Sequence, residues 1–357
     1  MNLVRRPGRR GLGIATALVL TLPLAACGSD DAAADGDTIT LRLAHYMPTT
    51  HQIAVDGIEV WMKEVEERTD GQVEFDYYPA GQLISAEEMF SSIRSGVVDI
   101  GAFVPASAAS AELPLSDVPT VPGFDLPDGQ VAQAAYWDLL NGALYEEEWS
   151  EQEIRPVMGV VTGLYQYVMS GDQRQGLDDW RGATVRTSGG VLDFVIEGMG
   201  GAPVNIPGPE EYEALQRGTV DSAINTIESI PVYDFNEVLD SATTNAPIGA
   251  SLTVMAISDQ AWEGLPEDVQ EAMTEASEVA QESIADSLAE QRVSAQEETS
   301  NDVEYYELND SALEELEPVL MEAQASWIEQ REAGGHPGQA IVDAWGEAVE
   351  AARAEAG

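Results

Sequence analysis

An alternation of strand-like and helix-like segments is the feature that most constrains how this chain can fold. Residues 38–44 and 73–77 alternate apolar and polar side chains with a period of two, which is typical of strands with one buried face. Between them, residues 53–65 carry apolar side chains at helical spacing. A short helix over 87–94 and a strand over 99–103 come next. This order predicts a largely parallel sheet with helices on its faces.

The alternation resumes in the second half of the chain. Strands are expected around residues 157–161, 164–169, 183–187 and 221–225. Long helices are expected over 267–299, where Pro266 suits the first turn, and then over 312–330 and 338–352. A chain of 357 residues exceeds the usual size of a single hydrophobic core, so two lobes are expected.

The N-terminal segment has the pattern of an exported lipoprotein. Four arginines precede an apolar run, Leu12 to Leu24, that is too short to cross a bilayer comfortably. The run ends in Leu-Ala-Ala-Cys27, which resembles a bacterial lipobox, and Cys27 is the only cysteine in the chain. We therefore expect a lipoprotein signal peptide over 1–26, lipid attachment at Cys27 and a flexible tether over 27–37. An ordinary signal peptide with an incidental cysteine is the alternative, and the export route stays open.

The charge of the chain restricts its partners. Sixty-four acidic residues against sixteen basic ones give a formal net charge of −48, which repels nucleic acid. No later segment is apolar for long enough to span a bilayer, so the lipid is expected to be the only membrane contact. The acidity indicates either adaptation to a saline exterior or GC-rich codon usage, although codon usage explains the scarcity of lysine better than the excess of acids.

Motifs for catalysis or metal binding are missing from the sequence. There is no G-x-S-x-G or H-E-x-x-H pattern, and His45, His51 and His336 are too scattered for a zinc site. We expect no catalytic residue, no metal and no cofactor. His45 ends the first expected strand and His51 opens the first helix, so each is a candidate either for a binding site or for a capping role.

Three stretches carry a family resemblance. They are Leu43-Ala-His-Tyr-Met-Pro48, then residues 78–83 with 95–101, and finally residues 176–187 with 214–225. The last pair is the most specific, since relatives have roughly D-L-K-G-L-K-I-R followed by A-L-Q-x-G-x-V-D-G-x-x-N. Together and in this order, the stretches resemble the DctP-type extracytoplasmic receptors of tripartite ATP-independent periplasmic (TRAP) transporters, over residues 38–345.

The resemblance implies an α/β, periplasmic-binding-protein-like fold with two α/β lobes around a central cleft and a long helix spanning both. Lobe I is expected from residues 38–162 plus 251–300. Lobe II is expected from residues 163–250 plus 301–357, including the C-terminal helices.

The resemblance also implies which residues bind the ligand. Arg186 holds the position of the family arginine that grips the ligand carboxylate, and Asn225 that of an asparagine whose amide contacts the ligand. The alternatives are that Arg186 pairs with a neighbouring acid and that Asn225 forms a turn. Receptors for C4-dicarboxylates often carry a second arginine, where this chain has Tyr165 or Gln166. A single cationic clamp favours a monocarboxylate, a keto acid or a zwitterion such as an ectoine-like compound over a dianion.

Aromatic and polar residues complete the candidate site. His45 lies at the first strand end, and Tyr46 and Phe103 could supply aromatic walls together with Tyr167, although Phe103 and Tyr167 suit a hydrophobic core equally well. Glu211 is expected to cap a helix start rather than contact the ligand.

The expected function is capture of a small organic acid or zwitterion by lobe closure, followed by delivery to the TRAP membrane permease subunits. An ABC-type or sensor-linked solute-binding lipoprotein would share the fold and the compartment. A secreted lyase or hydrolase is the enzymatic alternative.

Overall fold

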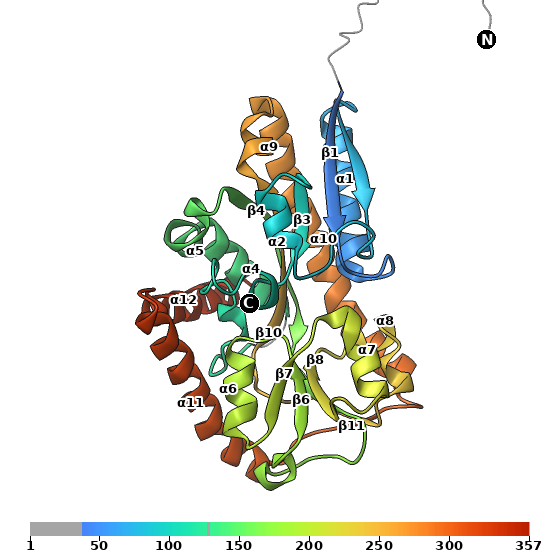
Figure 1. The fold of residues 1–357 in the computed structure, drawn as a ribbon, viewed down its shortest axis with the longest axis vertical. Coiled ribbons are helices and arrows are strands. Elements are labelled where there is room, and N and C mark those ends of the chain that lie inside the picture. The colour runs from blue at the N-terminus through green and yellow to red at the C-terminus, as the bar shows by residue number, and fades with distance from the viewer. Residues whose placement is uncertain (1–37, 127–128, 357) are drawn as a thin grey trace, which may run out of the picture. The chain divides into compact units, whose positions relative to one another are not determined.

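A computed structural model describes residues 38–126 and 129–356. The expected signal peptide, the lipid attachment at Cys27 and the tether fall in residues 1–37, outside the described residues. Within the described ranges, no helix is both long and apolar enough to cross a membrane. The described residues form two sheets, each covered by helices (Figure 1).

The first sheet contains five strands in the order β2-β1-β3-β10-β4. The strands are β1 (Ile39–His45), β2 (Val73–Tyr78), β3 (Ile100–Phe103), β4 (Ile154–Leu164) and β10 (Ala250–Ser258). The first three pair in parallel, whereas β10 is antiparallel to both β3 and β4. The parallel arrangement expected for the strands of residues 38–103 is therefore confirmed, and the sheet as a whole is mixed because β10 alone runs in the opposite direction.

The second sheet contains six strands in the order β11-β9-β5-β8-β6-β7. The strands are β5 (Gln166–Met169), β6 (Thr184–Thr187), β7 (Ala202–Asn205), β8 (Ser222–Asn225), β9 (Ser241–Thr243) and β11 (Glu304–Tyr306). Here β6 pairs in parallel with β7 and β8, and β5 is antiparallel to β8 and β9. The second sheet is also mixed.

Two neighbouring chain segments connect the sheets. Tyr165 alone separates β4 from β5, and residues 244–249 lead from β9 to β10. The backbone N–H of Tyr165 donates to the carbonyl of Gly249 at 2.9 Å. The crossing segments thus lie side by side and hold the two sheets in one compact unit.

The helices cover the faces of the sheets. They are α1 (Glu59–Arg68), α2 (Met89–Arg94), α3 (Pro105–Ala108), α4 (Gly129–Asn141), α5 (Ala143–Glu147), α6 (Val191–Gly198), α7 (Gly208–Gln216), α8 (Ser229–Val232), α9 (Asp259–Glu263), α10 (Glu267–Thr299), α11 (Asp310–Ala333) and α12 (Gly338–Ala356). A π-helical turn, Ile53–Ile58, precedes α1 directly.

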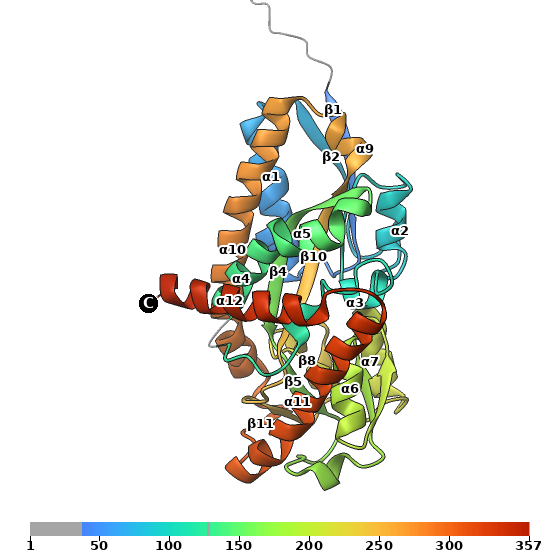
Figure 2. The same ribbon diagram turned by 90° about the vertical axis from the view of Figure 1, so that its left-hand side faces the viewer.

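The long helix α10 runs along both sheets (Figure 2). Near its start it packs against α1, where the indole N–H of Trp61 donates to the hydroxyl of Ser277 at 3.0 Å. Further along it contacts α8, and Arg292 donates from Nη2 to the carbonyl of Thr244 at 3.0 Å. The expected helix that spans both lobes is therefore present.

The two C-terminal helices contact each other but pack against different sheets. Helix α11 packs against α6 beside the second sheet, while α12 packs against α4 and α5, which belong to the first sheet (Figure 2). This placement of α12 differs from the expected grouping of all of residues 301–357 with lobe II, because the apolar face of α12, including Trp345, is buried on the lobe I side.

Candidate functional site

A central cavity of about 80 Å³ lies where strand ends of the two sheets meet. On one side, its lining follows the carboxyl ends of β1 and β3, with Tyr46 and Ser107. On the other, it follows the ends of β6 and β8, with Arg186 and Asn225. Ligands of α/β proteins bind outside the carboxyl ends of strands, because side chains from several strands converge there. The central cavity therefore has the position of a ligand site.

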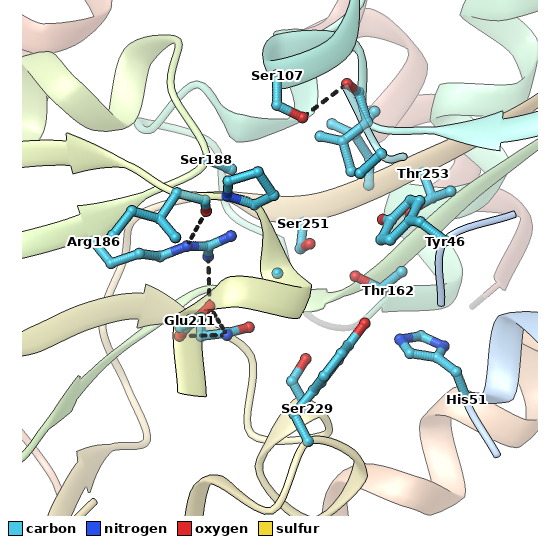
Figure 3. A pocket seen from close by; sticks show the side chains of 18 of the residues that line it. Tyr46, His51, Ser107, Thr162, Arg186, Ser188, Glu211, Ser229, Ser251 and Thr253 are labelled. Carbon is cyan, nitrogen blue, oxygen red and sulfur yellow. Dashed lines mark hydrogen bonds and ion pairs between the residues drawn. The ribbon is translucent and has the colours of Figure 1, made fainter. Parts of the chain in front are cut away.

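Arg186 is the cationic side chain among the described residues that line the central cavity. It sits on β6, is 6% exposed, and donates from Nε to the carbonyl of Ile206 at 2.8 Å and from Nη1 to that of Ile224 at 3.3 Å. Nη1 also lies 3.0 Å from Oε2 of Glu211. No hydrogen bond joins Nη2 to the described part of the chain. Figure 3 shows the guanidinium extending into the space faced by Ser251.

Glu211 is fully buried in the first turn of α7 and faces Arg186. Its two carboxylate oxygens each accept a hydrogen bond from Nδ2 of Asn225 at 2.9 Å. Burial raises the pKa of Glu211, while the charge of Arg186 and the Asn225 hydrogen bonds act in the opposite direction. Glu211 makes no side-chain capping bond, so the expected helix cap is replaced by a buried ion pair.

Hydroxyl groups and a neutral imidazole form much of the remaining wall. The hydroxyl side chains are Tyr46, Ser107, Thr162, Tyr165, Ser188, Ser229, Tyr233, Ser251 and Thr253. Burial lowers the pKa of His51 to about 4, so its ring is neutral at pH 7. Nδ1 of His51 accepts from the N–H of Ile53 at 3.2 Å, which leaves the ring proton on Nε2 as a donor. The wall thus offers hydrogen bonds but little charge.

Four of the expected ligand contacts line the central cavity, namely Arg186, Asn225, Tyr165 and Tyr46. The other three face elsewhere. Gln166 accepts from Thr243 and from the N–H of Ala246, both at 3.0 Å. His45 is buried and lies 2.7 Å from the Tyr77 hydroxyl.

Phe103 is the third expected ligand contact that lies outside the central cavity. Tyr167, the other candidate for an aromatic wall, lies outside it as well. Phe103 packs against Phe90 and Trp149, and Tyr167 against Trp180. Both rings are fully buried in the hydrophobic core. We leave Gln166, His45 and Phe103 out of the residues proposed to touch a ligand.

Several lining residues did not stand out in the sequence. Glu211 resembled the many other acidic residues at helix starts. Ser229 begins the short helix α8 and Tyr233 follows its end, and the sequence has no helical periodicity there that would predict this helix. Strand alternation is the signal that could have helped, because neighbouring residues of a strand face opposite sides. Once one of the neighbours Tyr165 and Gln166 is known to face the cavity, this alternation predicts that the other faces away from it.

A second space, which we call the rear cavity, takes part of its lining from two segments that also line the central cavity, namely the end of β4 and the start of α8. It measures about 120 Å³, and its lining includes Gln133, Gly163, Glu228 and Arg292. Thr162 and Ser229, the chain neighbours of Gly163 and Glu228, line the central cavity instead. Adjacent residues of the same two segments therefore line different cavities.

Comparison with known proteins identifies the family. The model of the DctP family, described as bacterial extracellular solute-binding protein, family 7, matches residues 43–330. The C4-dicarboxylate-binding periplasmic protein DctP of Rhodobacter capsulatus is 26% identical over 328 residues, which cover 90% of this chain and 91% of that protein. A solute-binding protein of Albidiferax ferrireducens is 27% identical over 186 residues, which are 51% of this chain and only 52% of that protein.

Solved structures share the fold. A TRAP solute-binding protein from Rhodoferax ferrireducens, in complex with copurified benzoate, superposes with a TM-score of 0.81 at 19% identity, covering 90% of this chain and all of that one. A TRAP periplasmic solute-binding protein from Bordetella bronchiseptica, with bound mandelate, gives a TM-score of 0.78 at 20% identity, covering 87% of this chain and 99% of that one. The family match and the two-lobed fold agree. The chain belongs to the DctP family of bacterial extracellular solute-binding proteins.

Proposed function

We propose that this protein is the extracytoplasmic receptor of a TRAP transporter and that it holds the carboxylate of a small solute on Arg186. The observation that carries the proposal is the Arg186 guanidinium, which is fixed by two backbone carbonyls and reaches the central cavity with Nη2 unused by the described chain. A guanidinium fixed in this way is pre-organised to donate to a carboxylate.

The lining supports a solute with one carboxylate. Arg186 is the only lysine or arginine among the described residues that line the cavity, and Tyr165 rather than Gln166 faces the cavity where C4-dicarboxylate receptors often carry a second arginine. A dianion would leave one charge without a cation, at a high desolvation cost. Monocarboxylates, keto acids and zwitterions remain as candidates. The benzoate and mandelate found in structural neighbours are carboxylates of this kind.

Capture proceeds by lobe closure without any chemical step. The central cavity takes its lining from both sheets, so a bound solute favours the arrangement in which both sets of residues contact it. The loaded receptor then docks the membrane permease subunits, and a lipid on Cys27 keeps it at the membrane. The protein releases the solute unchanged and is not an enzyme.

The test of the clamp is substitution of Arg186. Arg186→Ala removes a charge-assisted contact and should cost about 2–5 kcal/mol of solute affinity. Arg186→Lys keeps the positive charge beside Glu211 and so protects the fold, but it loses the planar donor pair and should bind at least tenfold more weakly. The solute is first identified by native mass spectrometry of protein from its own organism, and its affinity is then measured by isothermal titration calorimetry.

Arg217 supplies the control, since it is an exposed arginine of the same lobe that pairs with Glu213 outside the central cavity. Arg217→Ala should bind like the wild type. Wild-type affinity in both Arg186 variants, with thermal unfolding showing that they are folded, would rule out the clamp. Recovery of a chemically altered solute after incubation would instead favour a lyase or hydrolase.

A further inference from the structure

The rear cavity lies at a junction between the two lobes. Its lining comes mainly from α4, β4 and α10, three elements that pack against one another. Glu228 is the one described lining residue outside them. It stands directly before α8, which connects β8 to β9 of the second sheet. The side chain of Glu228 therefore reaches from the second lobe into a space that is otherwise formed by β4 and the two helices.

The carboxyl group of Glu228 lies directly against the backbone of β4. A Cβ atom placed on Gly163 would be 2.8 Å from Oε2 and 2.9 Å from Oε1 of Glu228, so a glycine leaves the room that this group needs. Glu228 is 7% exposed and forms no ion pair within the described chain. A carboxylate in such a place loses hydration without gaining a counterion in contact, which favours the protonated form.

Few groups near Glu228 can compensate a negative charge on it. The polar and ionisable neighbours are Gln130 and Gln133 on α4, Thr226 on the preceding loop, Arg292 on α10 and Tyr305 on β11, whereas β4 contributes only backbone and apolar side chains. Arg292 lowers the pKa of Glu228, but its Nη2 donates to the carbonyl of Thr244 at 3.0 Å. Burial raises the pKa of Tyr305, so this phenol is uncharged near pH 7. Desolvation of Glu228 therefore outweighs the attraction of Arg292.

The two lobes touch each other around the central cavity in this structure. His51, which follows β1, and Tyr233, which follows α8, meet with ring centroids 5.9 Å apart. Beside the same cavity, a Cβ atom on Gly190, just before α6, would lie 3.7 Å from that of Ala106 on α3. These contacts join the first lobe to the second, so the structure represents the closed arrangement.

The position of Glu228 depends on this closure. Thr162 and Ser229 line the central cavity, and they are the chain neighbours of Gly163 and Glu228. Neighbours in a chain move together, so a motion that carries Ser229 away from Thr162 also carries Glu228 away from Gly163. Opening of the lobes then exposes the carboxyl group to water.

We propose that Glu228 couples lobe closure to the binding of a proton: its carboxyl group lies uncharged against Gly163 when the lobes are closed and becomes a hydrated carboxylate when they open. This inference rests on the lobe closure proposed above, and it adds a control by pH that the solute-binding residues do not supply.

The sign of the effect follows from the two environments. In the closed arrangement, burial raises the pKa of Glu228 to about 7, from an ordinary value of 4.5 that hydration in the open arrangement restores. The preference for closure that Glu228 supplies is therefore full below about pH 4.5 and is lost as the pH rises through about 7. His51 has a pKa of about 4, so its charge stays constant in the upper part of this range.

The distance between the lobes, measured without any solute, tests the coupling. In a chain that begins after Cys27, Glu87→Cys and Glu210→Cys place two thiols at exposed positions. Their neighbours Ala86 and Pro209 stand at or beside the lining of the central cavity, one in each lobe. Spin labels on both thiols report the populations of closed and open lobes by double electron–electron resonance, in samples frozen from pH 5.5 and pH 8.5.

The ratio of closed to open lobes should be about fivefold or more larger at pH 5.5 than at pH 8.5. Glu228→Gln, which is permanently uncharged at nearly the same size, should keep the acidic ratio at both pH values. A ratio that does not change with pH in the wild type overturns the inference. A pH dependence that survives in Glu228→Gln overturns it as well.

Two further variants complete the design. Glu197→Gln is the matched control, because Glu197 is an exposed carboxylate on α6 of the second lobe and its loss should leave the pH dependence intact. Glu228→Met is uncharged and of similar length, and it replaces Glu228→Gln if the amide prevents folding. Glu148, whose pKa burial raises to about 8, also titrates in this range, but its contribution would persist in both Glu228 variants. Solute binding by the Arg186 variants tests the receptor function separately, so either proposal can fail alone.

Discussion

Glu228 is a buried carboxyl group that the binding site does not use. It is 7% exposed at the rear cavity, and burial raises its pKa to about 7, although Arg292 and Thr226 act to lower it. The folded protein therefore holds a proton here more tightly than the unfolded chain does. The contribution of Glu228 to stability is full below about pH 4.5 and is lost as the pH rises to about 7.

Glu228→Gln should remove this pH dependence. Relative to the variant, the wild type should lose about 3 kcal/mol of unfolding free energy between pH 4.5 and 7, since each pKa unit corresponds to about 1.4 kcal/mol. Urea unfolding at several pH values measures the difference. Glu147→Gln, at an exposed carboxylate, should show no such window. A constant gap between wild type and Glu228→Gln would contradict the prediction.

Asn225 shows how far single residues could be predicted. The family resemblance placed it at the ligand, and in the structure it ends β8 and lines the central cavity. Its amide, however, donates to Glu211 and accepts from the N–H of Thr226 at 2.8 Å, so it positions the ion pair. A sequence pattern fixes where a side chain is, but the choice among nearby partners depends on tertiary packing that it does not contain.

Among the secondary-structure elements, β4 contains a glycine that is constrained both by its backbone conformation and by a neighbouring side chain. Gly163 has φ of +144°, a region that favours glycine, and a Cβ atom there would lie 2.8 Å from Oε2 of Glu228. Gly171 has a similar φ of +136° but open space around its α-carbon. Substitution of each glycine by alanine therefore distinguishes the cost of backbone strain, common to both positions, from the cost of a steric contact, present only at Gly163.

Gly163→Ala should destabilise the protein more than Gly171→Ala. Both variants strain the backbone, by about 1 kcal/mol or more, but only the former also forces Glu228 to move within its buried site. The urea midpoints of the two variants give the comparison. Similar midpoints would show that the contact with Glu228 has no energetic weight.

Prediction of elements succeeded where the signal was local. Helix α10 runs over Glu267–Thr299 as expected, because Pro266 and a regular apolar stripe mark it. Strand β10 was not expected. Its run Ala250–Ser258 is almost entirely buried and lacks a period-two pattern, and its partners β3 and β4 lie about a hundred residues away or more. Strands as short as β9 and β11 offer too few residues for any pattern.

At the scale of the whole molecule, the excess of acidic over basic residues is the main electrostatic feature. Sixteen basic residues cannot neutralise sixty-four acidic ones, so most carboxylates repel one another in the compact state. At 0.1 M salt, the repulsion between carboxylates more than about 10 Å apart is largely screened, and at higher concentration closer carboxylates are screened as well. The two-lobed fold itself followed from chain length and from the family resemblance, since composition does not specify topology.

The urea midpoint should therefore rise with NaCl, from a few millimolar to molar concentrations. Sucrose at equal osmolality serves as the control, because it does not screen charge. Equal midpoints at low and high NaCl would argue against a saline adaptation and would leave codon usage as the source of the acidity.

The two cavities share two chain segments, and this has a practical consequence. Because Thr162 and Ser229 line the central cavity while their chain neighbours Gly163 and Glu228 line the rear cavity, a movement of either segment displaces residues of both cavities. Gln130 stands exposed at the rim of that surface. In a chain that begins after Cys27, Gln130→Cys introduces a unique thiol. If the central cavity binds a solute as proposed, the emission of an environment-sensitive fluorophore coupled there should change on binding, while the residues that line the central cavity stay unaltered.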